Sequence, residues 1–549
     1  PSLDPWQADA ARRLVDAWPA STPGLHRLAV DASAVQLMLA SGTPATWLRE
    51  IVAQVDAFVV SSGAGDDDLL ADQPRLAKSF ARLAAPAATW VAQDSDAAGQ
   101  EALRAAGFRF EPTPSAQPEA LALARHLPHF ISRGIDTRRS RNDAAEHRAL
   151  IVGGGLAGCA AAWALAEHGW RSTVFERGAA IAGAASGNSA GLFHGIVNGH
   201  DGAHARFNRA AALEARSAVA MAIGDHGVAG GIDGLLQLVD TPHTVQTMAA
   251  LLERLRLPAA YVRALDAGQA SAIAGLTLQR PAWFYPGGGW VHPAGLARSF
   301  LERAGAAVDL RCSTAVAALR RAGPNWELLD SIGHVIDSAA TVVLANGAEA
   351  PRLAGAQWPV ESVRGQISML SAARSTLLQA PKVPIAGSGY LLPEIGGQII
   401  FGATAQPGDI DPAVRLDDHA LNLAQLARLS PALGAAASID PARLCGRTSW
   451  RCTSRDRLPL IGGVPLQFDD QAPHAGDAEP RSDQPRFMPR QSGLYVYAAL
   501  GSRGIAWAAL GAQVLASTIG GAPSPIEASL LDAVDPARFM VRESRRLSR

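Results

Sequence analysis

The chain has 549 residues, of which 48% are hydrophobic and 18% are charged, so it is long enough to bury more than one core. Lys and Arg total 49 and Asp and Glu total 50, which gives a formal net charge of -1. This balance excludes a strong basic field over the whole chain. Any contact with nucleic acid must therefore come from local patches.

The spacing of the cysteines and the hydropathy of the chain predict its cellular compartment. The four cysteines lie far apart and form no C-x-x-C pair: Cys159, Cys312, Cys445 and Cys452. This pattern is typical of a reducing, intracellular setting. The longest apolar stretch, residues 494–519, is interrupted by an arginine and several glycines. We expect a cytoplasmic protein without membrane spans, and the sequence has no cluster of metal ligands.

Residues 1–115 alternate between helical and strand patterns, which predicts an α/β domain. The expected elements are a helix over Pro5–Trp18, strands at Leu25–Val30 and Val35–Leu39, a helix around Trp47–Gln54 and a strand at Ala57–Val60. Residues 116–147 are rich in Pro, Ser and charge and predict a linker. Its arginines, at positions 133, 138, 139 and 141, are either solvated or placed to meet phosphates.

A dinucleotide-binding fingerprint follows the linker. The apolar run Leu150–Val152 predicts a buried strand, and Gly153-x-Gly155-x-x-Gly158 comes directly after it. An Ala-rich helix then continues to His168, and the strand Ser172–Phe175 ends at Glu176. Gly153 permits the tight turn, Gly155 lets the backbone approach a diphosphate, and Gly158 lets the helix lie close to the strand. The acid is placed to accept hydrogen bonds from an adenosine ribose, and it disfavours NADP.

Later segments separate FAD from NAD. They include ASGNSAG at 185–191, YPGGGWVHP at 285–293, VVLANGAEA at 342–350, VRGQ at 363–366, GYLLPEIGGQIIFGAT at 389–404, RCTSRDRLPLIG at 451–462 and GSRG at 501–504. In order and spacing these segments resemble the D-amino-acid oxidase-like family of FAD-dependent oxidoreductases. The resemblance implies contacts to FAD from Ser186, Gly187, Asn188, Gly347, Gly501, Ser502, Arg503 and Gly504.

The same resemblance implies a fold and a domain division. The fold class is α/β, with a Rossmann-like FAD-binding domain interleaved with an α+β substrate domain over residues 148–536. We expect the FAD-binding parts at 148–225, 285–360 and 445–536, and the substrate parts at 226–284 and 361–444. Residues 468–490 predict a surface insertion, and residues 537–549 predict a basic tail with five arginines. This tail could form a frayed helix or an arm that contacts phosphates.

Residues 14–60, together with the later run ARLAAPAATWVAQDSDAAGQEALRAAGFRF at 81–110, resemble the later half of the methyltransferase domain of the MnmC family, whose members join a methyltransferase to such an oxidase. The match is incomplete. The opening glycine-rich turn that holds S-adenosylmethionine has no counterpart, Gly42-Thr43 stands where the family has Gly-Asp, and 59–64 replaces its Leu-Asp-Gly-Phe-Ala-Pro segment. We therefore expect a degenerate, partial α/β methyltransferase-like domain.

The resemblance implies oxidation of 5-carboxymethylaminomethyl-(2-thio)uridine at the wobble position of tRNA to the 5-aminomethyl form, with release of glyoxylate. The substrate is an N-substituted glycine, so its carboxylate calls for an arginine and a hydroxyl. Our candidates are Arg503, Tyr390 and Arg364, with Arg451 as a further one. Arg364 could instead hold backbone at the domain junction, and Tyr390 could be ordinary core. We assign no base role to His194 or His292, because hydride loss from a neutral amine needs no protein base.

Three other functions stay open at this stage. The chain could be a small-molecule glycine or sarcosine-type amine oxidase, a still-bifunctional methyltransferase and oxidoreductase acting on tRNA, or a tRNA-binding protein whose oxidase has decayed. The intact glycine fingerprint argues against the last of these. Neither the oligomeric state nor the electron acceptor follows from the sequence.

Overall fold

The computed structural model describes residues 4–29, 35–60, 75–93, 97–111, 121–128, 147–239, 244–374, 378–466 and 484–547. Most of the predicted linker, with its four arginines, and residues 468–483 of the predicted insertion lie outside the described residues. Across the described ranges, no helix combines the length and the apolarity that a membrane crossing requires.

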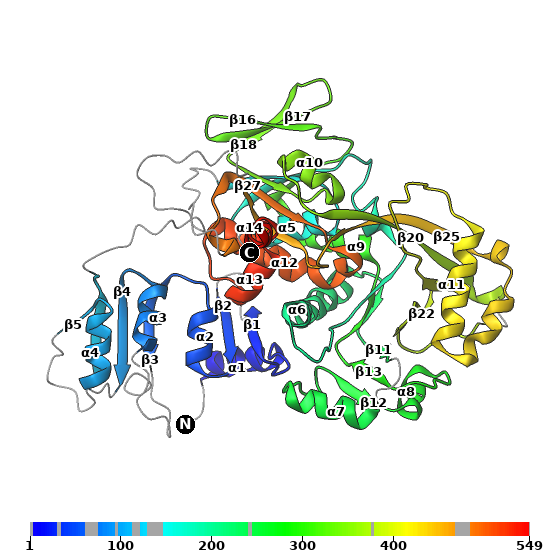
Figure 1. The fold of residues 1–549 in the computed structure, drawn as a ribbon, viewed down its shortest axis with the longest axis horizontal. Coiled ribbons are helices and arrows are strands. Elements are labelled where there is room, and N and C mark those ends of the chain that lie inside the picture. The colour runs from blue at the N-terminus through cyan, green and yellow to red at the C-terminus, as the bar shows by residue number, and fades with distance from the viewer. Residues whose placement is uncertain are drawn as a thin grey trace.

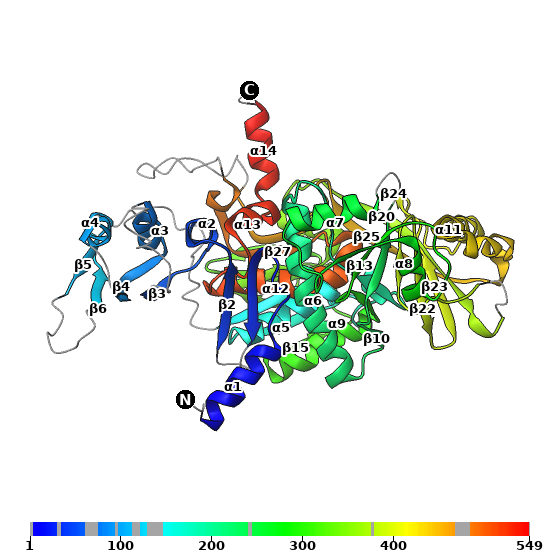
Figure 2. The ribbon, with the colours of Figure 1, turned by 90° about the horizontal axis from the view of Figure 1, so that it is seen from below.

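Three parts of the chain lie side by side in both views (Figures 1 and 2). The N-terminal α/β unit occupies one end, a unit built on a parallel sheet occupies the middle, and a larger sheet with its helix α11 occupies the other end. The middle unit carries the glycine fingerprint, so the site is expected where this unit meets the larger sheet.

The middle unit is built on a six-stranded sheet in the order β15-β8-β7-β19-β27-β26. All its neighbouring pairs are parallel except β26 with β27. The strands span Val308–Arg311, Arg171–Phe175, Arg148–Val152, Thr341–Leu344, Arg490–Ala498 and Leu460–Pro465 in that order. The helices packed with it into one core are α5 (Leu156–Glu167), α6 (Ala203–His226), α9 (Pro293–Ala304) and α12 (Gly504–Gly520). The predicted strand, glycine turn, helix and second strand are confirmed as β7, α5 and β8.

Helix α5 is buried on nearly all sides, which its sequence explains. Alanines and Cys159 fill it, so α12 and α9 can approach it closely without side-chain clashes. A small antiparallel sheet, β16 (Ala318–Ala322), β17 (Asn325–Leu329) and β18 (Val335–Ala339), and helix α10 (Ala350–Ala354) complete the middle unit.

The larger sheet has nine strands. Its order is β12-β13-β11-β21-β22-β23-β20-β24, with β25 also paired to β20. The strands span Arg263–Leu265, Ala282–Tyr285, Leu235–Leu238, Ile385–Ala386, Tyr390–Ile395, Gln398–Gly402, Val360–Ser371, Gln406–Pro407 and, for β25, Cys445–Ser454. Helices α7 (Val245–Arg254), α8 (Ala267–Ala274) and α11 (Leu416–Leu429) accompany it. Because β25 pairs with β20 along its length, this sheet extends past residue 444, where we had placed the return to the FAD-binding part.

A three-stranded sheet joins the two larger ones. It has the order β10-β14-β9, with β10 at Gly230–Gly231, β14 at Gly289–Val291 and β9 at Gly191–Phe193. Two interleaved sheets in one domain confirm the predicted fold class.

The N-terminal unit consists of a hairpin and a separate sheet. The hairpin pairs β1 (Gly24–Ala29) with β2 (Gln36–Ser41), and the sheet has the order β3-β4-β6-β5. These last strands span Val55–Val60, Ala84–Gln93, Leu121–His126 and Phe108–Phe110, with helices α1 (Pro5–Asp16), α2 (Pro44–Glu50), α3 (Arg75–Leu83) and α4 (Ala97–Ala105). Strand β6 lies inside the predicted 116–147 linker, so that prediction is wrong for 121–126: pairing with β4 and β5 orders a segment whose own sequence reads as irregular.

The predicted basic tail takes the helical form, one of the two that the sequence had left open. Residues 538–547 form helix α14, which follows α13 (Ala528–Val534). The Arg538 side chain is buried, and it donates to both carboxylate oxygens of Asp456 at 2.9 Å. Likewise Arg490, the last residue of the predicted insertion, begins β27 and is paired with Asp535 at 2.8 Å.

Candidate functional site

The glycine turn after β7 admits no larger residue at two of its positions. Gly153 has φ +110°, and a Cβ atom there would lie 2.7 Å from the carbonyl oxygen of Ala345. A Cβ atom on Gly158 would lie 1.9 Å from the carbonyl oxygen of Gly153. The first turn of α5 therefore packs directly on the end of β7. Gly155 stands at its N-cap, with free space for a ligand beside it.

Glu176 lies next to this turn, as the sequence predicted. Its carboxylate accepts hydrogen bonds from the N–H groups of Gly154 and Gly178, each at 2.8 Å. The two bonds hold the side chain at the carboxyl end of β8, beside the N-terminus of α5. An acid in this place is available to the hydroxyl groups of a sugar.

A cavity of about 900 Å³ runs from the glycine turn to the larger sheet. Of the predicted site residues, the following line it: Gly153, Gly155, Glu176, Ser186, Asn188, Gly347, Tyr390, Gly501, Ser502, Arg503 and Gly504. The N-termini of two helices, α5 and α12, open into this space, so the cavity favours negative charge.

Two predicted glycines support the cavity from behind. Gly158 contacts the turn itself, and Gly187 is surrounded by the Ala182 carbonyl oxygen and the Arg447 guanidinium. Arg447 donates to the carbonyl oxygens of Gly187, Gly183 and Ala184. Neither glycine is among the residues that line the cavity, so their part is to shape its wall.

Arg364 does not reach the cavity, which corrects its prediction as a substrate-binding residue. Its side chain is fully buried and lies 2.6 Å from the Asp418 carboxylate. It also donates to the backbone carbonyls of Asp411 and Ala413. Arg364 therefore fixes backbone beside the larger sheet, the alternative that the sequence had left open.

The register of the sheet explains why Arg451 faces the cavity and Arg364 does not. Strands β20 and β25 are antiparallel, with Arg451 opposite Val363 and Arg364 opposite Trp450. Opposite residues point to the same face and successive residues to opposite faces. The two arginines therefore project from opposite faces of the sheet, and Arg451 lines the cavity.

Arg451 and Tyr390 form a polar pair on the sheet side of the cavity. Arg451 donates to the Thr404 carbonyl oxygen at 2.6 Å, and no carboxylate among the described residues is paired with it. Burial lowers the pKa of Arg451, and the nearby Tyr390 counteracts this. Burial raises the pKa of Tyr390 to about 12, so its hydroxyl stays protonated and able to donate. A partly buried cation beside a hydroxyl donor is suited to a carboxylate.

Arg503 also lines the cavity. Burial lowers its pKa, while Tyr285 and Tyr261 lie close enough to raise it. Burial, together with the charge of Arg503, lowers the pKa of His194 to about 3. His194 is therefore neutral at physiological pH, and it cannot act as a cation toward a bound anion.

Two buried polar atoms in the cavity wall have no partner within the described part of the chain. They are the side-chain oxygens of Asn188 and Asn346, and both residues line the cavity. A buried acceptor without a donor is costly, so each is suited to an N–H or O–H group of a bound molecule. Asn346 was missed in the sequence analysis, although it lies within the quoted VVLANGAEA segment.

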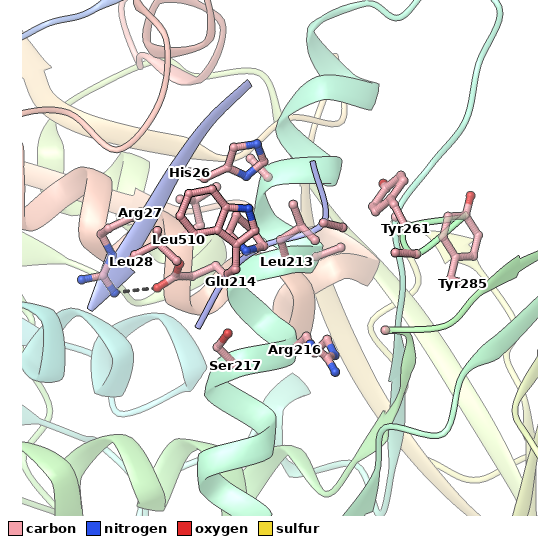
Figure 3. A pocket seen from close by; sticks show the side chains of 18 of the residues that line it. His26, Arg27, Leu28, Leu213, Glu214, Arg216, Ser217, Tyr261, Tyr285 and Leu510 are labelled. Carbon is pink, nitrogen blue, oxygen red and sulfur yellow. Dashed lines mark hydrogen bonds and ion pairs between the residues drawn. The ribbon is translucent and has the colours of Figure 1, made fainter. Parts of the chain in front are cut away.

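A second cavity, of about 410 Å³, lies between the N-terminal hairpin and α6 (Figure 3). His194 lines both cavities. Arg27 of β1 reaches across to Glu214 of α6, at 2.6 Å. The N-terminal segment thus packs against the wall behind the main cavity, a contact that no local sequence pattern had indicated.

The comparisons with known proteins agree with this geometry. The model of the FAD dependent oxidoreductase family matches residues 148–518. The tRNA 5-methylaminomethyl-2-thiouridine biosynthesis bifunctional protein MnmC of Methylibium petroleiphilum is 44% identical over 97% of this chain and 81% of its own length. The chain belongs to the MnmC family. The protein of the same name from Burkholderia multivorans is 38% identical, over 97% of this chain and 80% of its own length.

Membership of the MnmC family and of the FAD dependent oxidoreductase family makes this chain an FAD-dependent oxidoreductase, as predicted. The fold agrees as well: glycine oxidase from Geobacillus kaustophilus superposes with a TM-score of 0.56 at 23% identity, over 71% of this chain and 99% of that one. The cavity fits FAD. Its glycine turn leaves no room for Cβ atoms, two helix N-termini face it, and unpartnered asparagine oxygens line it.

Proposed function

We propose that this enzyme oxidises 5-carboxymethylaminomethyl-(2-thio)uridine at the wobble position of tRNA to the 5-aminomethyl form and releases glyoxylate. The observation that carries the proposal is the partly buried pair of Arg451 and Tyr390 at the wall of an FAD cavity. Its relatives, named for tRNA 5-methylaminomethyl-2-thiouridine biosynthesis, support tRNA as the substrate.

In this proposal, some residues of the chain bind the cofactor and others bind the substrate. The turn 153–158 and the N-terminus of α5 hold the diphosphate, and Glu176 binds the adenosine ribose. Residues 501–504 and the N-terminus of α12 face the pyrimidine edge of the flavin, where Arg503 adds positive charge. Ser186, Asn188 and Gly347 line the space between them.

Arg451 and Tyr390 bind the substrate carboxylate, the guanidinium through paired N–H groups and the phenol through its O–H. This contact places the α-carbon and its C–H bond inside the cavity with a neutral amine. When bound, FAD supplies the acceptor for the hydride. Loss of hydride from the α-carbon and of the amine proton leaves a C=N bond, water adds to its carbon, and the C–N bond then breaks to give glyoxylate and the free 5-aminomethyl group.

Nucleoside mass spectrometry tests this function. Hypomodified tRNA is incubated with the flavin-loaded enzyme, and the 5-aminomethyl nucleoside and glyoxylate are quantified. We expect equal amounts of both products. We also expect no methyl transfer when S-adenosylmethionine is added, because Gly42-Thr43 replaces the family's Gly-Asp. Absence of the 5-aminomethyl nucleoside would contradict the oxidation, and appearance of the methylated one would show a bifunctional enzyme.

A small-molecule amine oxidase is the second candidate. The pair Arg451 and Tyr390 recognises only a carboxylate, so it would hold free glycine or sarcosine in the same way. Turnover of either amino acid with none on tRNA would favour this candidate over the first.

A further inference from the structure

A groove on the outer surface collects arginines from segments far apart in the sequence. It has a volume of about 370 Å³ and is lined by α2, the loop at 484–486, α13 and α14. Five arginines and two acids are among its lining residues: Arg49, Arg486, Arg538, Arg542, Arg545, Glu50 and Asp532. The whole chain has a net charge of -1, so this local excess of positive charge departs from the average. We call this site the α2–α14 groove.

One face of α14 supplies most of the positive charge. Arg538, Arg542, Arg545 and Arg546 stand at i, i+4, i+7 and i+8, which places them on the same side of a helix. Arg538 is buried and already paired with Asp456, so it is not available to a ligand. Arg542 lies 2.5 Å from the same carboxylate, and about half of its side chain is exposed. Arg542 and Arg545 of this face line the groove. Helix α14 projects from the body of the molecule (Figure 2).

The opposite wall of the groove is fixed in place. The Glu50 carboxylate accepts a hydrogen bond from the Ser529 N–H at 2.9 Å, and the Ser524 N–H donates to the Val52 carbonyl at 2.8 Å. These bonds hold α2, and with it the exposed Arg49, against α13. The two walls are therefore positioned before any ligand arrives, which lowers the entropic cost of binding.

The acids of the groove are fewer than its arginines. Arg486 lies 3.6 Å from Asp532, and Glu50 is the other acid among the lining residues, against five arginines. A bound polyanion would compensate this excess of positive charge.

We propose that the α2–α14 groove binds the sugar-phosphate backbone of the tRNA substrate, outside the FAD cavity. The inference rests on the proposed function, which makes tRNA the substrate. A cavity of about 900 Å³ that also holds FAD can admit one nucleoside at most, so the rest of a tRNA must lie on the surface. Arginine forks bind phosphates through paired N–H groups, and several fixed arginines suit a chain of phosphates better than a single anion. The lining residues of the groove and of the FAD cavity do not overlap.

The test compares two double variants of the full-length, flavin-loaded protein. Arg49→Ala with Arg545→Ala removes one arginine from each wall, and Arg171→Ala with Arg298→Ala makes the same charge change at exposed positions outside both cavities. The Kd for hypomodified tRNA is measured at several KCl concentrations. For the groove variant we expect a Kd raised about tenfold at 0.1 M KCl and a salt slope smaller by about 1.5, as for two lost phosphate contacts. The control variant is expected to match the wild type.

The remaining outcomes would each contradict the proposal for a different reason. If the groove variant binds tRNA as the control does, while the wild type still converts tRNA, the groove is not the binding site and the proposed function stands. If the wild type binds no tRNA, the result contradicts both the groove proposal and the proposed function. If the groove variant loses the same affinity for poly-glutamate as for tRNA, the groove attracts acidic polymers in general and is not an RNA site. Flavin absorbance and melting temperature of both variants verify that the fold is intact.

Discussion

A Cβ atom on Gly158 would lie 1.9 Å from the carbonyl oxygen of Gly153, the first glycine of the same turn. This contact sets how closely α5 approaches β7, and hence where the helix N-terminus meets the cavity. The turn and the helix cannot separate without moving the groups that face the diphosphate.

Gly158→Ala should therefore lose FAD. The added methyl group must push α5 away from β7, which we expect to cost about 1–3 kcal/mol of folding free energy and to lower the flavin-to-protein absorbance ratio. Gly224→Ala is the control: Gly224 lies within α6 with nothing within 4 Å of the added Cβ, so this variant should be slightly more stable and keep its FAD. Full flavin content in Gly158→Ala would contradict the packing argument.

Arg451→Lys should impair catalysis without unfolding the protein. A lysine keeps the charge but loses the paired N–H groups, so we expect kcat/KM for the carboxymethylaminomethyl substrate to fall about 100-fold, or about 3 kcal/mol. The flavin spectrum and the melting temperature should stay near those of the wild type. A variant with normal kcat/KM would remove Arg451 from the carboxylate site.

Arg364→Met should have the opposite effect. The Asp418 carboxylate is 1% exposed and would lose its cation, which typically costs about 3–5 kcal/mol. Adding Asp418→Leu removes the orphaned charge and should recover part of that loss. Denaturant unfolding of the single and double variants measures both effects. An Arg364→Met variant that is stable but inactive would instead return Arg364 to the active site.

Arg364 and Arg451 show which features could be predicted from the sequence and which could not. The glycine turn was predictable because β7, α5 and β8 are contiguous and each glycine has a local backbone task. The roles of Arg364 and Arg451 were not predictable, because they depend on how β20 pairs with β25, and these strands lie about eighty residues apart. A shift of the pairing by one residue would exchange the faces on which the two arginines lie.

The order found in the predicted linker and in the predicted tail has the same origin. Strand β6 and helix α14 have sequences rich in charge or weak in periodicity, and long-range partners order them. For β6 these are β4 and β5, and for α14 the main one is the Asp456 carboxylate, about eighty residues away from Arg538. Segments of this kind read as linkers or tails until their partners are known.

Stability should fall as the pH is lowered through the range set by His194. Its pKa is about 3 in the folded protein and 6.5 for a histidine in an unfolded chain, so between these pH values the unfolded chain binds a proton that the folded chain does not. The contribution of neutral His194 is complete above pH 6.5 and is lost progressively toward pH 3. We expect His194→Gln to lose less stability than the wild type between pH 7 and pH 5, by about 2 kcal/mol.

The comparison with the variant is needed because other histidines titrate in the same direction. Burial also lowers the pKa values of His26, His168 and His204. Denaturant unfolding at pH 7 and pH 5 gives the difference for each protein. Identical pH dependence in wild type and variant would show that His194 is not held neutral by its surroundings.

The ion pair of Arg27 with Glu214 should couple the N-terminal hairpin to the oxidoreductase. The two side chains are 9% and 14% exposed and 2.6 Å apart, and Glu167 lies 3.5 Å from the same guanidinium. Arg27→Met leaves the largely buried Glu214 carboxylate without this cation beside the second cavity, so we expect a loss of about 3 kcal/mol and faster proteolysis of the N-terminal segment. Arg13→Met, which breaks an exposed pair with Asp9, should cost less than about 1 kcal/mol. A double-mutant cycle of Arg27→Met with Glu214→Gln measures the coupling directly. A coupling energy no larger than that of the exposed pair would show that the hairpin is held by apolar packing against α6 alone.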